Sequence, residues 1–149
     1  MTSDMTSDTQ LRIARQFISS LPHARALGLD VAEIAPGRAV FTMPYDVQLI
    51  GDPETGVMAG GAVSALLDTT CGAAVMSHPE SAAATATLDL RIDYMRPATP
   101  GQTLRAEAEC YHVTRSVAFV RAVALDDDRA HPVATATGAF TFRKKEAAE

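Results

Sequence analysis

Tryptophan is absent from this 149-residue chain, and cysteine occurs only twice, at Cys71 and Cys110. Two cysteines cannot form the disulfide framework of a small secreted domain, and neither stands in a CxxC or Cys/His spacing typical of metal ligands. The four histidines show no metal-binding spacing either. The sequence therefore predicts no metal site and a reducing compartment, so the expected location is cytoplasmic.

The chain also lacks a lysine-rich run and any alternation of basic with aromatic residues, and its formal net charge of -5 is modest. Nucleic acid is therefore not an expected partner. The longest stretch with few charges, residues 55–77, contains Asp68 and is rich in Gly, Ala, Ser and Thr, which argues against a transmembrane span. The N-terminal segment has neither the basic nor the apolar region of a signal peptide. No membrane association is expected.

Apolar residues make up 47% of the chain, which suffices for the core of one domain of this length. We expect a disordered N-terminal tail over residues 1–9, where the tetrapeptide MTSD occurs twice. A single domain is expected over residues 10–143, followed by a short C-terminal tail over residues 144–149.

Apolar periodicity predicts the elements of this domain. An amphipathic helix covers residues 11–21 and ends near Pro22, and a hairpin joins residues 29–34 to 39–43 through a Pro-Gly turn. A long apolar helix begins at a Gly-Gly pair and runs over residues 60–77. Four further strands, connected by short turns as a meander, are expected over residues 84–95, 103–113, 117–125 and 133–142.

The strand over residues 84–95 alternates between two faces. Leu88, Leu90, Ile92 and Tyr94 share one face, and Thr87, Asp89, Arg91 and Asp93 share the other. Its apolar face needs a cover, which only the long helix offers. We therefore predict an α+β fold, in which a curved antiparallel sheet wraps around one central helix and an N-terminal helix packs outside. Such a sheet leaves an open edge, which pairing with a second copy would close, so a homo-oligomer is expected.

Asp68 is the only charged residue in residues 55–77. Removing a carboxylate from water costs several kcal/mol unless it is paired or hydrogen-bonded, so a lone acid in such a helix needs a role. One role is that of general base in a cleft. The alternative is a structural one, in which Asp68 pairs across a subunit interface or caps neighbouring backbone.

Three motifs in order carry a resemblance to a known family: GVMAGG at residues 56–61, LLD at residues 66–68, and LDLRIDYMRP at residues 88–97. They resemble the hotdog-fold thioesterases of the phenylacetate-degradation (PaaI-like) group over residues 27–142. The resemblance implies hydrolysis of acyl-CoA thioesters at an intersubunit site, in dimers or dimers of dimers, with no metal or other cofactor.

The resemblance also implies roles for residues. Asp68 takes the place of the acidic base or nucleophile, and Gly60 that of the backbone N–H that contacts the thioester oxygen. Unpaired N–H groups at the positive end of a helix suit a developing oxyanion. Thr87 matches a Ser/Thr position that orients the attacking water from the neighbouring subunit, although an ordinary strand residue is the equal alternative. Ala59, Gly61, Val57 and Met58 are expected to contact the substrate, with Val63 and Leu67 as further tunnel candidates.

Coenzyme A carries phosphates, and Arg96 and Arg115, which flank turns, are the leading candidates to bind them; Arg91, Arg143 and Lys144 are also near strand ends. Cys71 is interpreted as core filling rather than a nucleophile. One departure from the family is Ala59, which stands where the family usually has histidine. It leaves open a catalytically silent acyl-CoA-binding protein, and it argues against a hotdog hydratase or dehydratase, which needs a histidine.

Overall fold

The computed structural model describes residues 2–82 and 84–146. Its helices are α1 (Thr2–Ser20), α2 (Pro22–Ala26) and α3 (Gly60–Met76), with a 3-10 turn at Val47–Leu49. A six-stranded antiparallel sheet consists of β1 (Asp30–Ala35), β2 (Arg38–Met43), β5 (Thr87–Tyr94), β6 (Leu104–Val113), β7 (Val117–Leu125) and β8 (Ala134–Thr141). A separate small hairpin joins β3 (Ile50–Asp52) to β4 (Val57–Met58).

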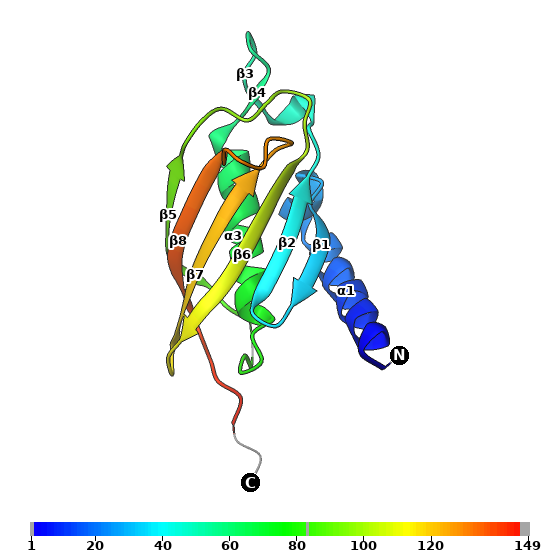
Figure 1. The fold of residues 1–149 in the computed structure, drawn as a ribbon, viewed down its shortest axis with the longest axis vertical. Coiled ribbons are helices and arrows are strands. Elements are labelled where there is room, and N and C mark those ends of the chain that lie inside the picture. Colours follow the sequence, from blue (N-terminus) through cyan, green and yellow to red (C-terminus); the bar gives the residue numbers. More distant parts are fainter. Residues whose placement is uncertain (1, 83, 147–149) are drawn as a thin grey trace.

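The long helix α3 lies against one face of the sheet and contacts all six strands (Figure 1). Small residues on that face let the helix approach closely: Ala106, Ala108, Ala122, Ala124 and Ala136 are all buried. The helix fills the space with Leu66 and Leu67, which are fully buried. The predicted architecture, one sheet around a central helix with an N-terminal helix outside, is confirmed.

The order of strands across the sheet is β1-β2-β6-β7-β8-β5. The predicted meander is correct for β6, β7 and β8, but it is wrong for β5, which pairs with β8 at the edge of the sheet. The connection from β5 to β6 crosses one end of the sheet (Figure 1). Antiparallel pairing requires only complementary faces and edges, so chain order did not determine the partner of β5.

Helix α1 begins at Thr2 rather than near Leu11, so the structure differs from the disordered tail expected over residues 1–9. Residue 1 lies outside the described residues, as do residues 147–149 of the expected C-terminal tail. Within that tail, Lys144 forms an isolated bridge with Ser81, and the N–H of Lys145 donates to the carbonyl of Glu80. The chain therefore stays against the fold at least to Lys145.

An ion pair between a partly exposed arginine and a buried aspartate connects two loops at the same end of the sheet. Arg96, after β5, donates to both carboxylate oxygens of Asp126, after β7, at 2.7 and 2.6 Å. The backbone N–H and the hydroxyl of Thr99 also donate to Asp126, at 3.1 and 2.9 Å. The Asp126 side chain has no solvent exposure, and its hydrogen bonds from Arg96 hold its pKa well below the usual range.

We predict that Arg96→Met lowers the free energy of unfolding by roughly 3 kcal/mol near pH 7, because it leaves Asp126 buried and unpaired. The depressed pKa of Asp126 in the folded protein contributes stability above its unfolded pKa of about 3.9, and this contribution is lost as the pH falls below that value. The difference between parent and variant should therefore shrink below about pH 4. Urea unfolding of the parent and the variant at several pH values, at one protein concentration, measures this difference in the free energy of unfolding.

Arg91→Met is the matched control, because Arg91 is 78% exposed and, among the described residues, pairs only with the exposed Asp93. Its effect should stay within about 0.5 kcal/mol. Equal losses for the two variants would contradict the structural role of the Arg96–Asp126 pair.

Candidate active site

The first turn of α3 offers backbone N–H groups without partners. Ala59, the N-cap residue, is extended and gives no side-chain cap, and its own N–H donates to the carbonyl of Leu49 at 2.7 Å. Within the described part of the chain, no acceptor pairs with the N–H of Gly60 or Gly61, and both glycines are exposed. These donors lie at the positive end of the helix dipole, so the site can bind an oxygen that carries negative charge.

Tyr94, the last residue of β5, fixes this helix start. Its hydroxyl donates to the carbonyl of Gly60 at 2.9 Å, and the hydroxyl of Ser64 donates to the same oxygen at 3.1 Å. The two hydroxyls are also in contact with each other, so their two protons are shared among the three oxygens. A Cβ at position 60 would lie 3.5 Å from the Tyr94 ring. Sequence analysis missed this contact, although it placed Tyr94 on the helix-facing side of its strand.

A cavity of about 450 Å³ lies beside the helix start. Its lining includes Gly60, Tyr94 and three residues proposed from the sequence as substrate contacts, Val57, Met58 and Val63. Ala59 and Gly61 are not among the lining residues, and Leu67 is fully buried in the core. The structure therefore brings only part of the predicted substrate-binding set to one cavity.

Asp68 lies two turns further along α3 and is half-buried. The hydroxyl of Thr87 donates to its Oδ1 at 2.7 Å, from the same chain. Among the described residues no other donor reaches this carboxylate, so one oxygen stays available. The expectation that Thr87 points away with Asp89, Arg91 and Asp93 is wrong, because a β-bulge turns Thr87 toward the helix.

Gly60 and Asp68 do not meet within one chain. Eight residues of α-helix span about 12 Å, whereas groups that act on one carbonyl must lie within about 3–3.5 Å of the reacting atoms. Each chain therefore presents two separate candidate positions, one at the start of α3 and one at Asp68, and we refer to these two positions as the half-sites.

The two arginines proposed for phosphate binding lie at opposite ends of β7. Arg96 pairs with Asp126, which follows β7, and Arg115 lies in the exposed turn that precedes β7. Besides Asp126, the Arg96 guanidinium donates to the carbonyls of His131 and Pro97, at 2.9 and 3.1 Å. Most of its N–H donors are therefore engaged within the protein, although Arg96 also lines the cavity beside the helix start. The phosphate role predicted for Arg96 stays a prediction, and the exposed Arg115 has the guanidinium more available to an anion.

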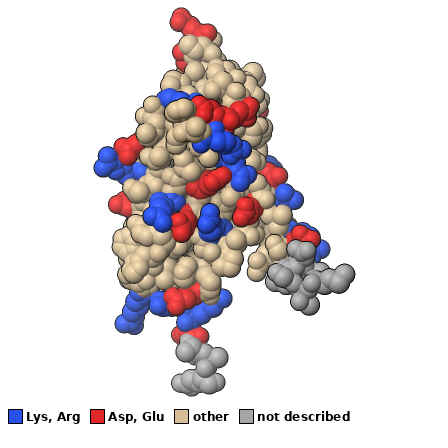
Figure 2. Space-filling view, in the orientation of Figure 1, with Lys and Arg blue, Asp and Glu red and all other residues tan. Residues whose placement is uncertain are grey.

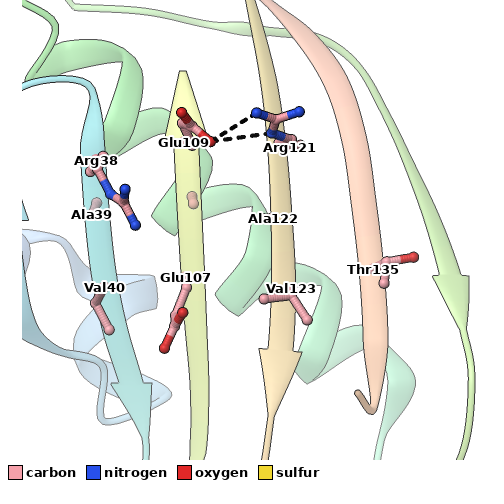
Figure 3. Close-up of a pocket in the computed structure, with 10 residues that line it drawn as sticks. Arg38, Ala39, Val40, Glu107, Glu109, Arg121, Ala122, Val123 and Thr135 are labelled. Atoms are coloured by element: carbon pink, nitrogen blue, oxygen red, sulfur yellow. Dashed lines mark hydrogen bonds and ion pairs between the residues drawn. The ribbon is translucent and has the colours of Figure 1, made fainter. Parts of the chain in front are cut away.

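A second cavity, of about 390 Å³, lies on the outer face of the sheet (Figure 3). Charged side chains of both signs border it, and Arg121 pairs there with Glu109 at 3.1 Å. Acidic and basic groups are intermixed over this whole face (Figure 2). The sheet separates this groove from α3, so it is not part of either half-site.

Nowhere in residues 2–82 and 84–146 do three or more His, Cys, Asp or Glu side chains come together as a possible metal site. No helix of the same residues is long and apolar enough to cross a membrane.

Comparison with known proteins identifies the family. The profile of the thioesterase superfamily matches residues 55–132, which include both half-sites. A solved structure from Pseudomonas aeruginosa is 44% identical, covers 88% of this chain and 97% of its own, and superposes with a TM-score of 0.78. The chain therefore belongs to the thioesterase superfamily, and its fold is the hotdog fold.

Two relatives have names that state an activity. The acyl-coenzyme A thioesterase PaaI of Escherichia coli is 35% identical over 60% of each chain. Its solved structure covers 91% of this chain and 94% of its own, at 25% identity and a TM-score of 0.79. The medium/long-chain acyl-CoA thioesterase YigI of Salmonella typhimurium is 23% identical over 94% of this chain and 98% of its own.

We predict that Cys71 does not react with iodoacetamide in the native protein at pH 8. Cys71 is fully buried on α3, and burial, together with the nearby charge of Asp68, raises its thiol pKa to about 12. The thiolate, which is the reactive form, is then scarce. Mass spectrometry of native and urea-unfolded samples measures the labelling; native modification of Cys71 would contradict its placement in the core.

Proposed function

We propose that this protein is an acyl-CoA thioesterase, in which the N–H of Gly60 binds the thioester oxygen and Asp68 activates water or attacks directly. The observation that carries the proposal is the pairing of two features: unpaired N–H donors beside a cavity, and a half-buried carboxylate oriented by Thr87. The activity stated in the names of PaaI and YigI supports it.

The chemistry requires one developing charge to be stabilised and one proton to be transferred. As water or the carboxylate adds to the carbonyl carbon, negative charge develops on the carbonyl oxygen, which the N–H of Gly60 stabilises. In the water route, Asp68 takes the proton from water and the C–S bond breaks. The proton then passes to the leaving sulfur, which gives a free acid and CoA.

We propose that the working site forms between two subunits, because 12 Å of helix separates Gly60 from Asp68 in one chain. Antiparallel placement of two copies of α3 would bring the Gly60 of one chain to the Asp68 of the other. The edge strand β5 is suited to this pairing, since Leu88 and Tyr94 are 58% and 51% exposed. The minimal assembly is thus a homodimer, and the resemblance favours a dimer of dimers.

We propose that the phosphates of coenzyme A bind Arg115 together with Arg143. The N–H of Phe142 donates to the carbonyl of Ser116, which holds the end of β8 beside the turn that contains Arg115. The N–H of Thr141 donates to the carbonyl of Ala86, so the same region adjoins Thr87 and the Asp68 half-site. Both arginines are exposed and can reach an anion.

We predict that Asp68→Asn lowers turnover of acyl-CoA esters at least a hundredfold, since it removes the base or nucleophile but keeps the size of the side chain. Thiol release from short, medium, long and aryl acyl-CoA esters measures the turnover. The control is Asp93→Asn, which changes an exposed acid on β5.

Equal turnover in Asp68→Asn and the parent protein would remove Asp68 from the mechanism. Absence of release from every ester, with tight acyl-CoA binding, would instead favour a silent binding protein, for which Ala59 is the supporting feature.

We predict that Arg115→Glu and Arg143→Glu each raise KM for acyl-CoA about tenfold, because each removes a charge-assisted contact to phosphate. The KM for the matching acyl-pantetheine, which lacks the nucleotide phosphates, should not change. Arg91→Glu on the outer face is the control. Equal KM changes for the two substrates would contradict the phosphate role.

A further inference from the structure

The start of β5 contains a β-bulge at Leu88. Pairing between β5 and β8 is regular from Tyr94 back to Asp89, which lies opposite Ala139. The next pair joins Thr87 to Phe140, so two residues of β5 advance for one of β8. Leu88 is the extra residue, and it is 58% exposed.

The bulge decides which face Thr87 occupies. In a regular strand, residues two apart share a face, so Thr87 would lie with Asp89 on the outer side of the sheet. Instead, Thr87 lies opposite Phe140, which is buried on the helix side at 2% exposure. The one-residue shift is therefore the reason that the Thr87 hydroxyl reaches Asp68.

Two residues hold the bulge in place. The side-chain Oδ1 of Asp89 accepts the backbone N–H of Ala139 at 2.8 Å, from the strand that faces the irregularity. At Gly138, an added Cβ would lie 2.3 Å from the carbonyl oxygen of Asp89 and 3.0 Å from the Cα of Leu90. Only glycine permits this approach of the two backbones.

We propose that Asp89 is a positioning residue for thioester hydrolysis: by holding the bulge against Ala139 and Gly138, it keeps Thr87 on the face where its hydroxyl orients Asp68. Asp89 itself touches neither substrate nor Asp68, and it acts from the opposite side of the sheet. This inference rests on the proposed function, because the orientation of Asp68 matters only if Asp68 takes part in the reaction.

Two conservative variants separate the geometry of Asp89 from its charge. Asp89→Asn keeps an oxygen at the same position and should keep kcat within about twofold of the parent. Asp89→Glu keeps the charge but moves the oxygen by one methylene, and it should lower kcat about tenfold with little change in KM. Asp93→Glu, on the same face of the same strand but outside the bulge, is the matched control and should be silent. Urea unfolding confirms that each variant is folded.

A double-mutant cycle with Thr87→Ala tests whether Asp89 acts through Thr87. Thr87→Ala should itself lower kcat about tenfold, and adding Asp89→Glu should cause no further loss, because the positioned hydroxyl is already gone. Additive losses, or equal kcat for Asp89→Glu and the parent, would overturn the proposal. Asp68→Asn, assayed in parallel, distinguishes the failures: loss in Asp68→Asn without loss in Asp89→Glu would leave the proposed function standing and refute only the role of Asp89.

Discussion

The close packing of α3 on the sheet determines where Gly60 and Asp68 lie. The alanines on the inner face let the helix settle against the strands, and its leucines and Val75 then exclude water from the interface. Asp68 and Gly60 are consequently held on one rigid element rather than on loops. The precision that the proposed catalysis needs comes from the core itself, and the neighbouring cavity combines residues of α3, β4 and β5 with residues of connecting segments.

Strand β5 forms hydrogen bonds with α3 at both Gly60 and Asp68. Its last residue, Tyr94, binds the carbonyl of Gly60, and its first residue, Thr87, binds the carboxylate of Asp68. The carbonyl of Gly60 is thus occupied by protein donors, while no acceptor in the described part of the chain pairs with its N–H. A ligand oxygen can therefore bind this N–H without displacing a contact among those residues. The edge strand therefore orients both half-sites. Its second hydrogen-bonding edge, on the side away from β8, has no neighbouring strand in the six-stranded sheet.

Most strands and the long helix follow from sequence periodicity, because apolar residues at spacings of two and three to four residues report burial directly. The positions of residues that depend on partners far away in the sequence could not be predicted from this periodicity. Arg96 was assigned to phosphate because it is a basic residue that flanks a turn, and its partner Asp126, 30 residues away in another loop, was not apparent from the sequence. Thr87 was placed on the wrong face because a bulge interrupts the alternation. Gly138, an isolated glycine in a strand, is a signal for a bulge or a close backbone approach, but it does not tell which residue of the neighbouring strand is the extra one.

The ion pair between Arg96 and Asp126 couples the connection after β5 to the connection after β7. Arg96 also borders the cavity at the start of α3, so the shape of that cavity depends on both connections at once. An insertion in either connection would displace the Arg96–Asp126 ion pair and so change the conformation of the other connection. Homologues that retain this pair should therefore vary this cavity through side chains or through the β3–β4 hairpin, and should conserve the lengths of these two loops together.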